Sequence, residues 1–293
     1  MNAPLHAGLV PGNARSIGDI LLATGRLNSD GLARILERQR QDQIPFGEAA
    51  IALNLLTRED IDLALSKQFD YAYLIEGQSQ LSTQLVAAYK PFSRIVENLR
   101  AVRSQLLLRW LSQEPAHKAL AVVSAGKGDG RSFIAANLGV VFAQQGQRTL
   151  LIDGDMRASA ERSQHALFKL DKGPGLSGIL SGRCTLDVAQ EVAGLPGLSV
   201  LVAGAQPPNP QELLGRPAFG QMLFDAASRY DVVLIDTPSG SDYSDAEIIA
   251  ARAGAAILVA RRHASQVPQV RKLGQRLQDD GAVLVGSVLN DVK

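Results

Sequence analysis

The chain has 293 residues, of which 46% are hydrophobic and 20% charged. Lys and Arg number 30 and Asp and Glu 29, and this balance excludes nucleic-acid binding driven by bulk positive charge. A single cysteine, Cys184, excludes an intrachain disulfide framework and favours a reducing compartment. No apolar run approaches the ~20 residues that span a bilayer. We therefore expect a cytoplasmic protein of about two domains, with residues 1–15 as a flexible tail.

An internal repeat follows this tail. Residues 17–39 (IGDILLATGRLNSDGLARILERQ) align without gaps with residues 46–68 (FGEAAIALNLLTREDIDLALSKQ). In each copy a short apolar helix leads to a turn, and then Asn28 or Thr57 stands as the N-cap of a second helix with acidic residues in its first turn. The pattern predicts a small all-α module of four helices over residues 16–75.

The composition changes after the repeat. Residues 76–92, rich in Gln and Ser and with Pro91 near the end, are predicted to be a linker. Residues 93–111 have the spacing of one amphipathic helix, whose apolar face comprises Ile95, Leu99, Val102, Leu106 and Leu107.

From residue 118 onward, apolar runs alternate with helical patterns. Strands are predicted at 119–123, 149–152, 198–202, 232–235, 255–260 and 282–289, and helices at 132–145, 211–228, 245–252 and 266–279. Near-continuous apolar strands separated by helices indicate a mostly parallel sheet covered on both faces. The predicted fold class is α/β, a doubly wound domain over residues 93–293 that binds ligands at the carboxyl ends of its strands.

A glycine-rich loop stands between the first of these strands and its helix. Backbone N–H groups of such a loop cradle phosphate groups, and Ser132 would place its hydroxyl on Mg²⁺. The loop departs from the pattern G-x-x-x-x-G-K-[ST], because Ala125 replaces the first glycine and Arg131 the lysine. Lys127 would supply the missing ammonium or be a solvated loop residue. The predicted nucleotide-binding segment comprises Gly126, Lys127, Gly128, Asp129, Gly130, Arg131, Ser132 and Phe133.

Carboxylates end two other predicted strands. Asp153 and Asp155 follow the strand at 149–152, and Asp236 ends the strand at 232–235. Such carboxylates hold hydrated Mg²⁺ or accept a proton. A single Asp at a strand end is more simply a turn or helix cap. Three such segments in this order, each after a strand, predict a P-loop NTPase site for ATP and Mg²⁺.

These segments, with two further motifs, resemble the bacterial tyrosine kinases (BY-kinases) of polysaccharide export, which are relatives of the MinD and ParA ATPases. Residues 204–214 (GAQPPNPQELL) are similar to their PPNPxELL signature. Residues 97–103 (ENLRAVR) match their ExxRxxR segment, in which Glu97, Arg100 and Arg103 would join protomers. The GDGRS loop and residues 288–291 (VLND) are most similar to the EpsG-type chain-length determinant kinases.

The resemblance implies an ATP- and Mg²⁺-dependent enzyme of exopolysaccharide biosynthesis that transfers phosphate to tyrosine. Its partner would be a membrane-embedded Wzz-like chain-length determinant protein that recruits a homo-oligomeric ring to the inner membrane. The resemblance also implies roles for the site residues. Arg131 and Ser132 would contact the phosphates and Mg²⁺, and Asp153 and Asp155 would serve the metal or act as the base for the acceptor. Arg157 would hold the loop or a phosphate, Asp236 would complete the metal contacts, and Asn290 would contact adenine or cap a strand.

Two departures leave other functions open. The family kinases phosphorylate a C-terminal tyrosine cluster, whereas the last tyrosine of this chain is Tyr243. The missing tyrosine cluster favours a MinD/ParA-like ATPase without kinase activity. Arg131 presents a planar fork in place of a point charge. This favours a regulatory subunit that binds nucleotide without hydrolysing it.

The repeat resembles the MshEN-type domain found ahead of type II secretion ATPases, which can bind cyclic di-GMP. The arginine expected two residues before each repeat glycine is absent, because Ser16 precedes Gly18 and Pro45 precedes Gly47. Without guanidinium contacts to guanine and phosphate, we expect weak or no cyclic di-GMP binding. A protein-interaction module is the alternative.

Overall fold

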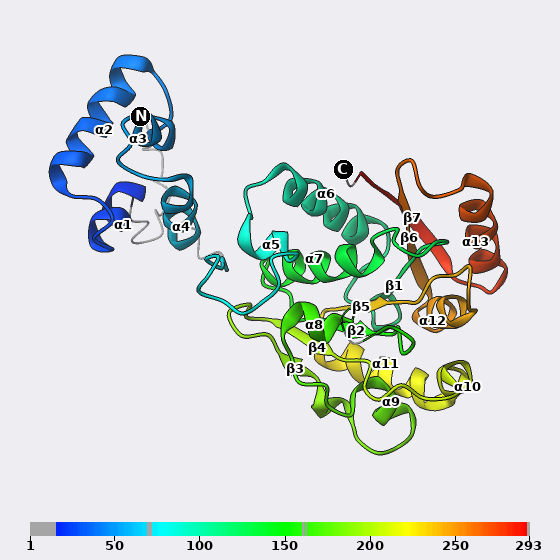
Figure 1. The fold of residues 1–293 in the computed structure, drawn as a ribbon. Coiled ribbons are helices and arrows are strands. Elements are labelled where there is room, and N and C mark those ends of the chain that lie inside the picture. Colours follow the sequence, from blue (N-terminus) through cyan, green and yellow to red (C-terminus); the bar gives the residue numbers. More distant parts are fainter. Residues whose placement is uncertain (1–15, 69–71, 160, 162, 292–293) are drawn as a thin grey trace, which may run out of the picture. The chain divides into compact units, whose positions relative to one another are not determined.

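The computed structural model describes residues 16–68, 72–159, 161 and 163–291, so the expected tail at 1–15 lies outside the described residues (Figure 1). The chain divides into two compact units, residues 1–73 and 74–293. We describe each unit by itself.

The first unit contains the four predicted helices: α1 (Ile17–Ala23), α2 (Ser29–Asp42), α3 (Phe46–Ala52) and α4 (Arg58–Gln68). Helix α1 packs on α4 and α2 packs on α3, so each contact joins the two copies of the repeat. The side chains between them form a separate apolar core that includes Leu21, Ile35 and Ile61. The predicted N-caps are in place, because Asn28 Oδ1 accepts a hydrogen bond from Gly31 N–H at 2.8 Å and Thr57 Oγ1 accepts one from Asp60 N–H at 3.2 Å.

Each copy of the repeat has a glycine near the start of its first helix, and the packing there explains why. A Cβ atom on Gly18 would lie 2.9 Å from Leu32 Cδ1, and one on Gly47 would lie 3.2 Å from Ile61 Cγ2. Leu32 and Ile61 are themselves matched residues of the repeat. Both copies therefore use the same close approach between an early glycine and a branched side chain of the second helix.

The second unit is built on a seven-stranded sheet with the order β3-β4-β2-β5-β1-β6-β7. All strands are parallel except β3, which is antiparallel to β4. The six predicted strands are present, and β3 is a short addition. Their bounds are β1 (Ala119–Val123), β2 (Thr149–Asp153), β3 (Gln190–Glu191), β4 (Leu198–Leu201), β5 (Val232–Asp236), β6 (Ala255–Arg261) and β7 (Val283–Asn290).

Helices cover both faces of this sheet (Figure 1). Helix α7 (Arg131–Ala143) packs on β1, β2 and β5, and α6 (Arg94–Arg109) packs on α7 and contacts β7. Helices α11 (Pro217–Arg229), α12 (Asp245–Ala253) and α13 (Val267–Asp279) share a core with the alternate strand residues Ala121 and Val123. The shorter elements are α5 (Val86–Tyr89), η1 (Pro115–His117), α8 (Gln164–Phe168), α9 (Gly175–Leu180), η3 (Leu186–Val188) and α10 (Pro210–Gly215).

The structure differs from the predicted elements in two places. The single helix expected over 211–228 is two helices, α10 and α11, because Pro217 lacks an N–H and favours the first turn of a new helix. Residues 76–92, expected to be a linker, belong to the second unit and contain α5. The fully buried Asn137 of α7 accepts a hydrogen bond from Ala87 N–H at 2.9 Å and donates one to the Gln84 carbonyl at 3.0 Å.

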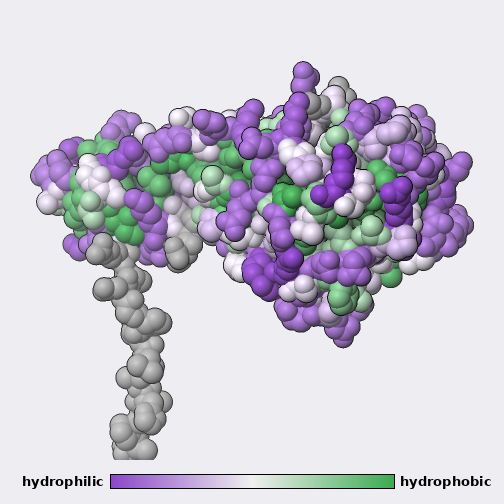
Figure 2. Space-filling view, turned by 90° about the horizontal axis from the view of Figure 1, so that it is seen from below, coloured by the Kyte–Doolittle hydropathy of each residue, from purple (hydrophilic) through white to green (hydrophobic). Residues whose placement is uncertain are grey.

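The visible surface is chemically mixed. On the face shown in Figure 2, hydrophilic residues cover most of the molecule and hydrophobic residues occur in groups between them. Within the described part of the chain, no helix combines the length and the apolar character that crossing a membrane requires.

Candidate nucleotide site

The three predicted segments meet because their strands are neighbours. Strands β2, β5 and β1 lie side by side and parallel, so their carboxyl ends share one edge of the sheet. A pocket of about 610 Å³ opens there. It is lined by Gln84, Lys127, Gly128, Gly130, Arg131, Ser132, Phe133, Asp155, Arg157, Ala158, Ser159, Glu161, Leu167, Pro238, Ser239 and Tyr243.

Hydrogen bonds made by Asp129 and Asn290 hold the glycine-rich loop in place. The Asp129 carboxylate is buried and accepts hydrogen bonds from Gly126 N–H at 2.9 Å and from Ser265 Oγ at 2.7 Å. Asn290 Nδ2 donates to the Asp129 carbonyl at 2.9 Å, and a Cβ atom on Gly130 would lie only 2.1 Å from this nitrogen. Gly130 also has a φ of 98°, which disfavours other residues. Asn290 thus contacts the loop and does not line the pocket.

Arg131 begins α7, and its guanidinium is turned toward the protein. The side chain is 8% exposed. Its Nε donates to the Thr237 carbonyl at 2.8 Å, and its Nη1 donates to Ser124 Oγ at 2.6 Å and to the Gly126 carbonyl at 3.0 Å. Arg131 therefore joins the glycine-rich loop to the segment that follows β5, while still lining the pocket.

Two other cations border the pocket. Lys127 is largely exposed and forms an ion pair with Asp242 at 3.0 Å. Arg157 donates from Nε and Nη2 to the fully buried Asp245 carboxylate at 2.7 and 3.2 Å, and its guanidinium carbon lies 4.0 Å from the centre of the Tyr243 ring. The forked pair holds Arg157 at the edge of the pocket.

Asp153 and Asp236 lie beneath the pocket on neighbouring strands. They are direct partners in the β2–β5 register, and both are at most 2% exposed. Burial and the facing Asp236 carboxylate hold the pKa of Asp153 well above its ordinary value. Burial also raises the pKa of Asp236, and the Arg131 guanidinium opposes that rise. A negative charge on Asp236 therefore disfavours a negative charge on Asp153.

Asp155 differs from Asp153 because it lines the pocket. Its Oδ1 accepts a hydrogen bond from Arg157 N–H at 3.1 Å. Burial raises the pKa of Asp155, while the backbone hydrogen bond from Arg157 opposes the rise. Of the two predicted base candidates, Asp155 is the one that an incoming hydroxyl can reach.

The residues present fit a Mg²⁺ ion. Asp236 Oδ1 is buried, and no donor among the described residues lies in hydrogen-bond geometry with it, although the Ser132 hydroxyl is close enough to lower the pKa of Asp236. A buried carboxylate oxygen without a partner is costly, and a hydrated cation would satisfy it. Ser132 and Asp236 are therefore the residues that would hold the metal.

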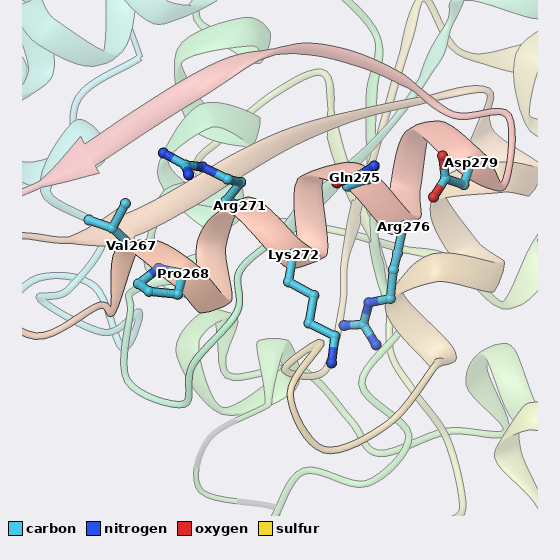
Figure 3. Close-up of a pocket in the computed structure, with 7 residues that line it drawn as sticks. All are labelled: Val267, Pro268, Arg271, Lys272, Gln275, Arg276 and Asp279. Atoms are coloured by element: carbon cyan, nitrogen blue, oxygen red, sulfur yellow. The ribbon is translucent and has the colours of Figure 1, made fainter.

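A second pocket lies along α13 and is lined by residues of that helix alone, whereas several segments line the pocket at the strand ends (Figure 3). Arg271 is directed away from Lys272 and Arg276 in Figure 3. Arg276 is already engaged, because it donates to the Gly240 carbonyl at 2.8 Å and pairs with Glu247 at 3.0 Å. We therefore place the candidate nucleotide site at the strand ends.

The three residues of the ExxRxxR segment lie on α6, away from the pocket lining. Glu97 and Arg100 form an ion pair at 3.0 Å within the helix. Arg103 Nη1 donates to the Val141 carbonyl of α7 at 2.8 Å. Their role between protomers stays a prediction.

Sequence patterns do not indicate Gln164, Asp245 or the placement of Tyr243 at the site. Gln164 contacts both Asp153 and Asp236, and Asp245 fixes Arg157. Asp245 was visible only as an acidic residue at a predicted helix start. Nothing in the local sequence distinguishes Gln164.

Curated relatives match 69–74% of this chain. CapB of Staphylococcus aureus, a putative tyrosine-protein kinase, is 33% identical over 69% of this chain and 86% of CapB. The tyrosine-protein kinase YwqD of Bacillus subtilis is 32% identical over 73% of this chain and 89% of YwqD. The match to the Escherichia coli tyrosine-protein kinase Etk, at 34% identity, spans only 28% of that longer protein. No protein-family model matches the chain.

Solved structures of tyrosine kinase domains are also similar to this chain. The kinase domain of Escherichia coli Etk superposes with a TM-score of 0.68 at 32% identity, covering 75% of this chain and 84% of that domain. The chimerical protein CapA2B2 superposes with a TM-score of 0.65 at 33% identity, covering 77% of this chain and 96% of that chain. MinD of Pyrococcus horikoshii has a TM-score of 0.51 at 24% identity, covering 59% of this chain and 69% of that chain, and shares the fold. With the three strand-end segments in one pocket and CapB and YwqD matched over most of their length, the chain belongs to the bacterial tyrosine kinase (BY-kinase) family and has the P-loop NTPase fold.

Proposed function

We propose that the second unit binds Mg²⁺–ATP in this pocket and transfers the γ-phosphoryl group to a tyrosine hydroxyl. The observation that carries the proposal is a pocket lined by the glycine-rich loop and Asp155, beside the buried Asp236, whose Oδ1 has no hydrogen-bond partner among the described residues. The names of CapB and YwqD as tyrosine-protein kinases support tyrosine as the acceptor.

The residues have distinct roles in this reaction. Backbone N–H groups at the start of α7 would bind the phosphates, and Ser132 and Asp236 would hold Mg²⁺, which supplies positive charge to the transferred group. Asp155 would take the proton from the tyrosine oxygen as that oxygen bonds to phosphorus and the bond to the β–γ bridging oxygen breaks, releasing ADP. Asp153, buried beneath the pocket, would orient this cluster.

Asp155→Asn and Asp236→Asn separate these roles. Asp155→Asn should lower phosphotransfer to a tyrosine peptide by about 10²-fold or more with little change in Mg²⁺–ADP affinity. Asp236→Asn should weaken Mg²⁺–ADP binding itself. Asp279→Asn, on the exposed side of α13, is the charge-matched control and should change neither. If the wild-type protein binds no nucleotide in the presence of Mg²⁺, the proposal is wrong.

One observation favours a second candidate, a nucleotide-binding regulator without kinase activity. The Arg131 guanidinium donates from Nε and Nη1 to protein oxygens. ATP hydrolysis without phosphotyrosine would identify a MinD/ParA-like ATPase. Nucleotide binding without any turnover would identify a regulatory subunit.

We further propose a role in exopolysaccharide chain-length control or export. The PPNPQELL segment supports it through the family resemblance. The partner would be a Wzz-like membrane protein that recruits a homo-oligomer of this chain to the inner membrane. Two assays test this: turnover should increase when the partner's cytoplasmic segment is added, and co-sedimentation with membranes should increase when those membranes contain the partner.

A further inference from the structure

Gln164, the first residue of α8, joins three elements of the site. Its side chain is fully buried. Its backbone N–H donates to Asp153 Oδ2 at 2.8 Å, and its side-chain Nε2 donates to Asp236 Oδ2 at 2.7 Å and to the Ser132 carbonyl at 3.2 Å. One residue thus contacts the end of β2, the end of β5 and the first turn of α7.

The orientation of this amide is fixed by its partners. The Ser132 carbonyl and the ionised Asp236 carboxylate only accept hydrogen bonds, so the amide oxygen does not take the place of Nε2. Gln164 Oε1 is therefore directed elsewhere, where it is buried and has no partner among the described residues. The amide has one arrangement, in which it always donates to Asp236.

This donation decides which oxygen of Asp236 is free. Oδ2 accepts the hydrogen bond from Gln164, and Oδ1 is the oxygen that has no partner within the described part of the chain. Without the amide, the carboxylate could rotate and both oxygens would compete for the same cation. Residues that hold a metal-binding side chain in this way typically change metal affinity when they are removed.

We infer that Gln164 is a positioning residue for the metal site, which holds the Asp236 carboxylate with Oδ1 directed at Mg²⁺. The inference rests on the proposed function, because it requires Mg²⁺ at Asp236. The amide acts on Asp236 and not on the nucleotide. Its loss should therefore reduce the contribution of Mg²⁺ to nucleotide binding and leave metal-free binding unchanged.

The test compares ADP affinity with and without Mg²⁺, by calorimetry on the full chain. The wild-type protein should bind ADP more tightly in Mg²⁺. In Gln164→Leu this gain should shrink by about tenfold or more, while metal-free ADP affinity stays within about twofold. Gln164→Met, which keeps the unbranched shape without a donor, gives the same comparison if the leucine variant does not fold.

Gln144→Leu is the matched control. Gln144, at the end of α7, also donates from Nε2 to a carbonyl, that of Ala87 at 2.9 Å, but it does not contact the carboxylates. It should change thermal stability without changing the Mg²⁺ gain. An unchanged gain in both Gln164 variants would overturn the inference. Failure of the wild-type protein to bind ADP in Mg²⁺ would instead overturn the proposed function.

Discussion

Arg131 shows how one substitution changes what a phosphate loop requires. A lysine at this position places a compact charge at the end of a flexible stem, whereas a guanidinium offers several donors in one plane. In this structure those donors reach oxygens on two different segments, at Thr237 and at Ser124 and Gly126. The residue therefore stabilises the loop in addition to any role toward phosphate.

We predict that Arg131→Lys lowers the free energy of unfolding of the nucleotide-free protein by about 1–3 kcal/mol, because one ammonium cannot replace all three hydrogen bonds. ATP turnover should be kept or raised, because lysine restores the usual charge. Chemical denaturation and a phosphate-release assay measure the two effects. Turnover that collapses while stability is unchanged would instead identify Arg131 as a catalytic residue.

Residue patterns predicted part of the site and not the rest, for a physical reason. Asp153, Asp155 and Asp236 were found because a carboxylate after a buried strand is a local signal, and parallel strands place their ends together. Gln164 acts through Asp236, which is 72 residues away in the chain. Its role arises only when α8 folds against two strand ends, so local patterns carry no trace of it. Asn290 was found, but its contact with Asp129 depends on the position of β7.

At the scale of elements, an ion pair joins β2 and β5 at their amino ends, whereas their carboxyl ends carry the facing aspartates. Arg148 donates from Nε and Nη2 to Asp231 at 3.2 and 2.8 Å. Arg148 N–H donates to the same carboxylate at 3.0 Å. This hydrogen bonding fixes the register that brings Asp153 opposite Asp236.

The Asp231 contact predicts a pH dependence. The Arg148 side-chain hydrogen bond lowers the pKa of Asp231 below its ordinary value of 3.8. A lowered pKa in the folded state stabilises the fold at pH values above the ordinary value, and this contribution is lost as the pH falls through the folded value. Asp231→Asn should therefore lower the thermal midpoint at pH 7, and the difference from wild type should begin to shrink below about pH 4 and disappear only below the lowered pKa of the folded state. Asp279→Asn, measured in parallel, should show no such convergence.

Helix α6 carries the predicted contacts between protomers. Arg100→Ala should shift the light-scattering mass toward the monomer if Glu–Arg pairs join subunits. Arg103→Ala should do the same and also destabilise the fold by about 1 kcal/mol, because it removes the bond to the Val141 carbonyl. Arg94→Ala, at the exposed start of the same helix, is the charge-matched control. An unchanged mass in both variants would leave the segment with an intrachain role.

At the scale of the whole molecule, the chain combines two units that each have their own core. The positions two residues before the repeat glycines carry no guanidinium: Ser16 caps α1 through its bonds with Asp19, and Pro45 precedes α3. We predict that calorimetric titration of the full chain with cyclic di-GMP gives no saturable heat at micromolar concentrations. A micromolar dissociation constant would contradict this and show that backbone and apolar contacts suffice.

The cross-packing of the first unit makes its two copies depend on each other. Since α1 packs on α4 and α2 on α3, each copy covers apolar side chains of the other. A single copy would leave those side chains in water unless it associated with a second copy. Because both copies belong to one chain, this association is intramolecular and does not depend on protein concentration.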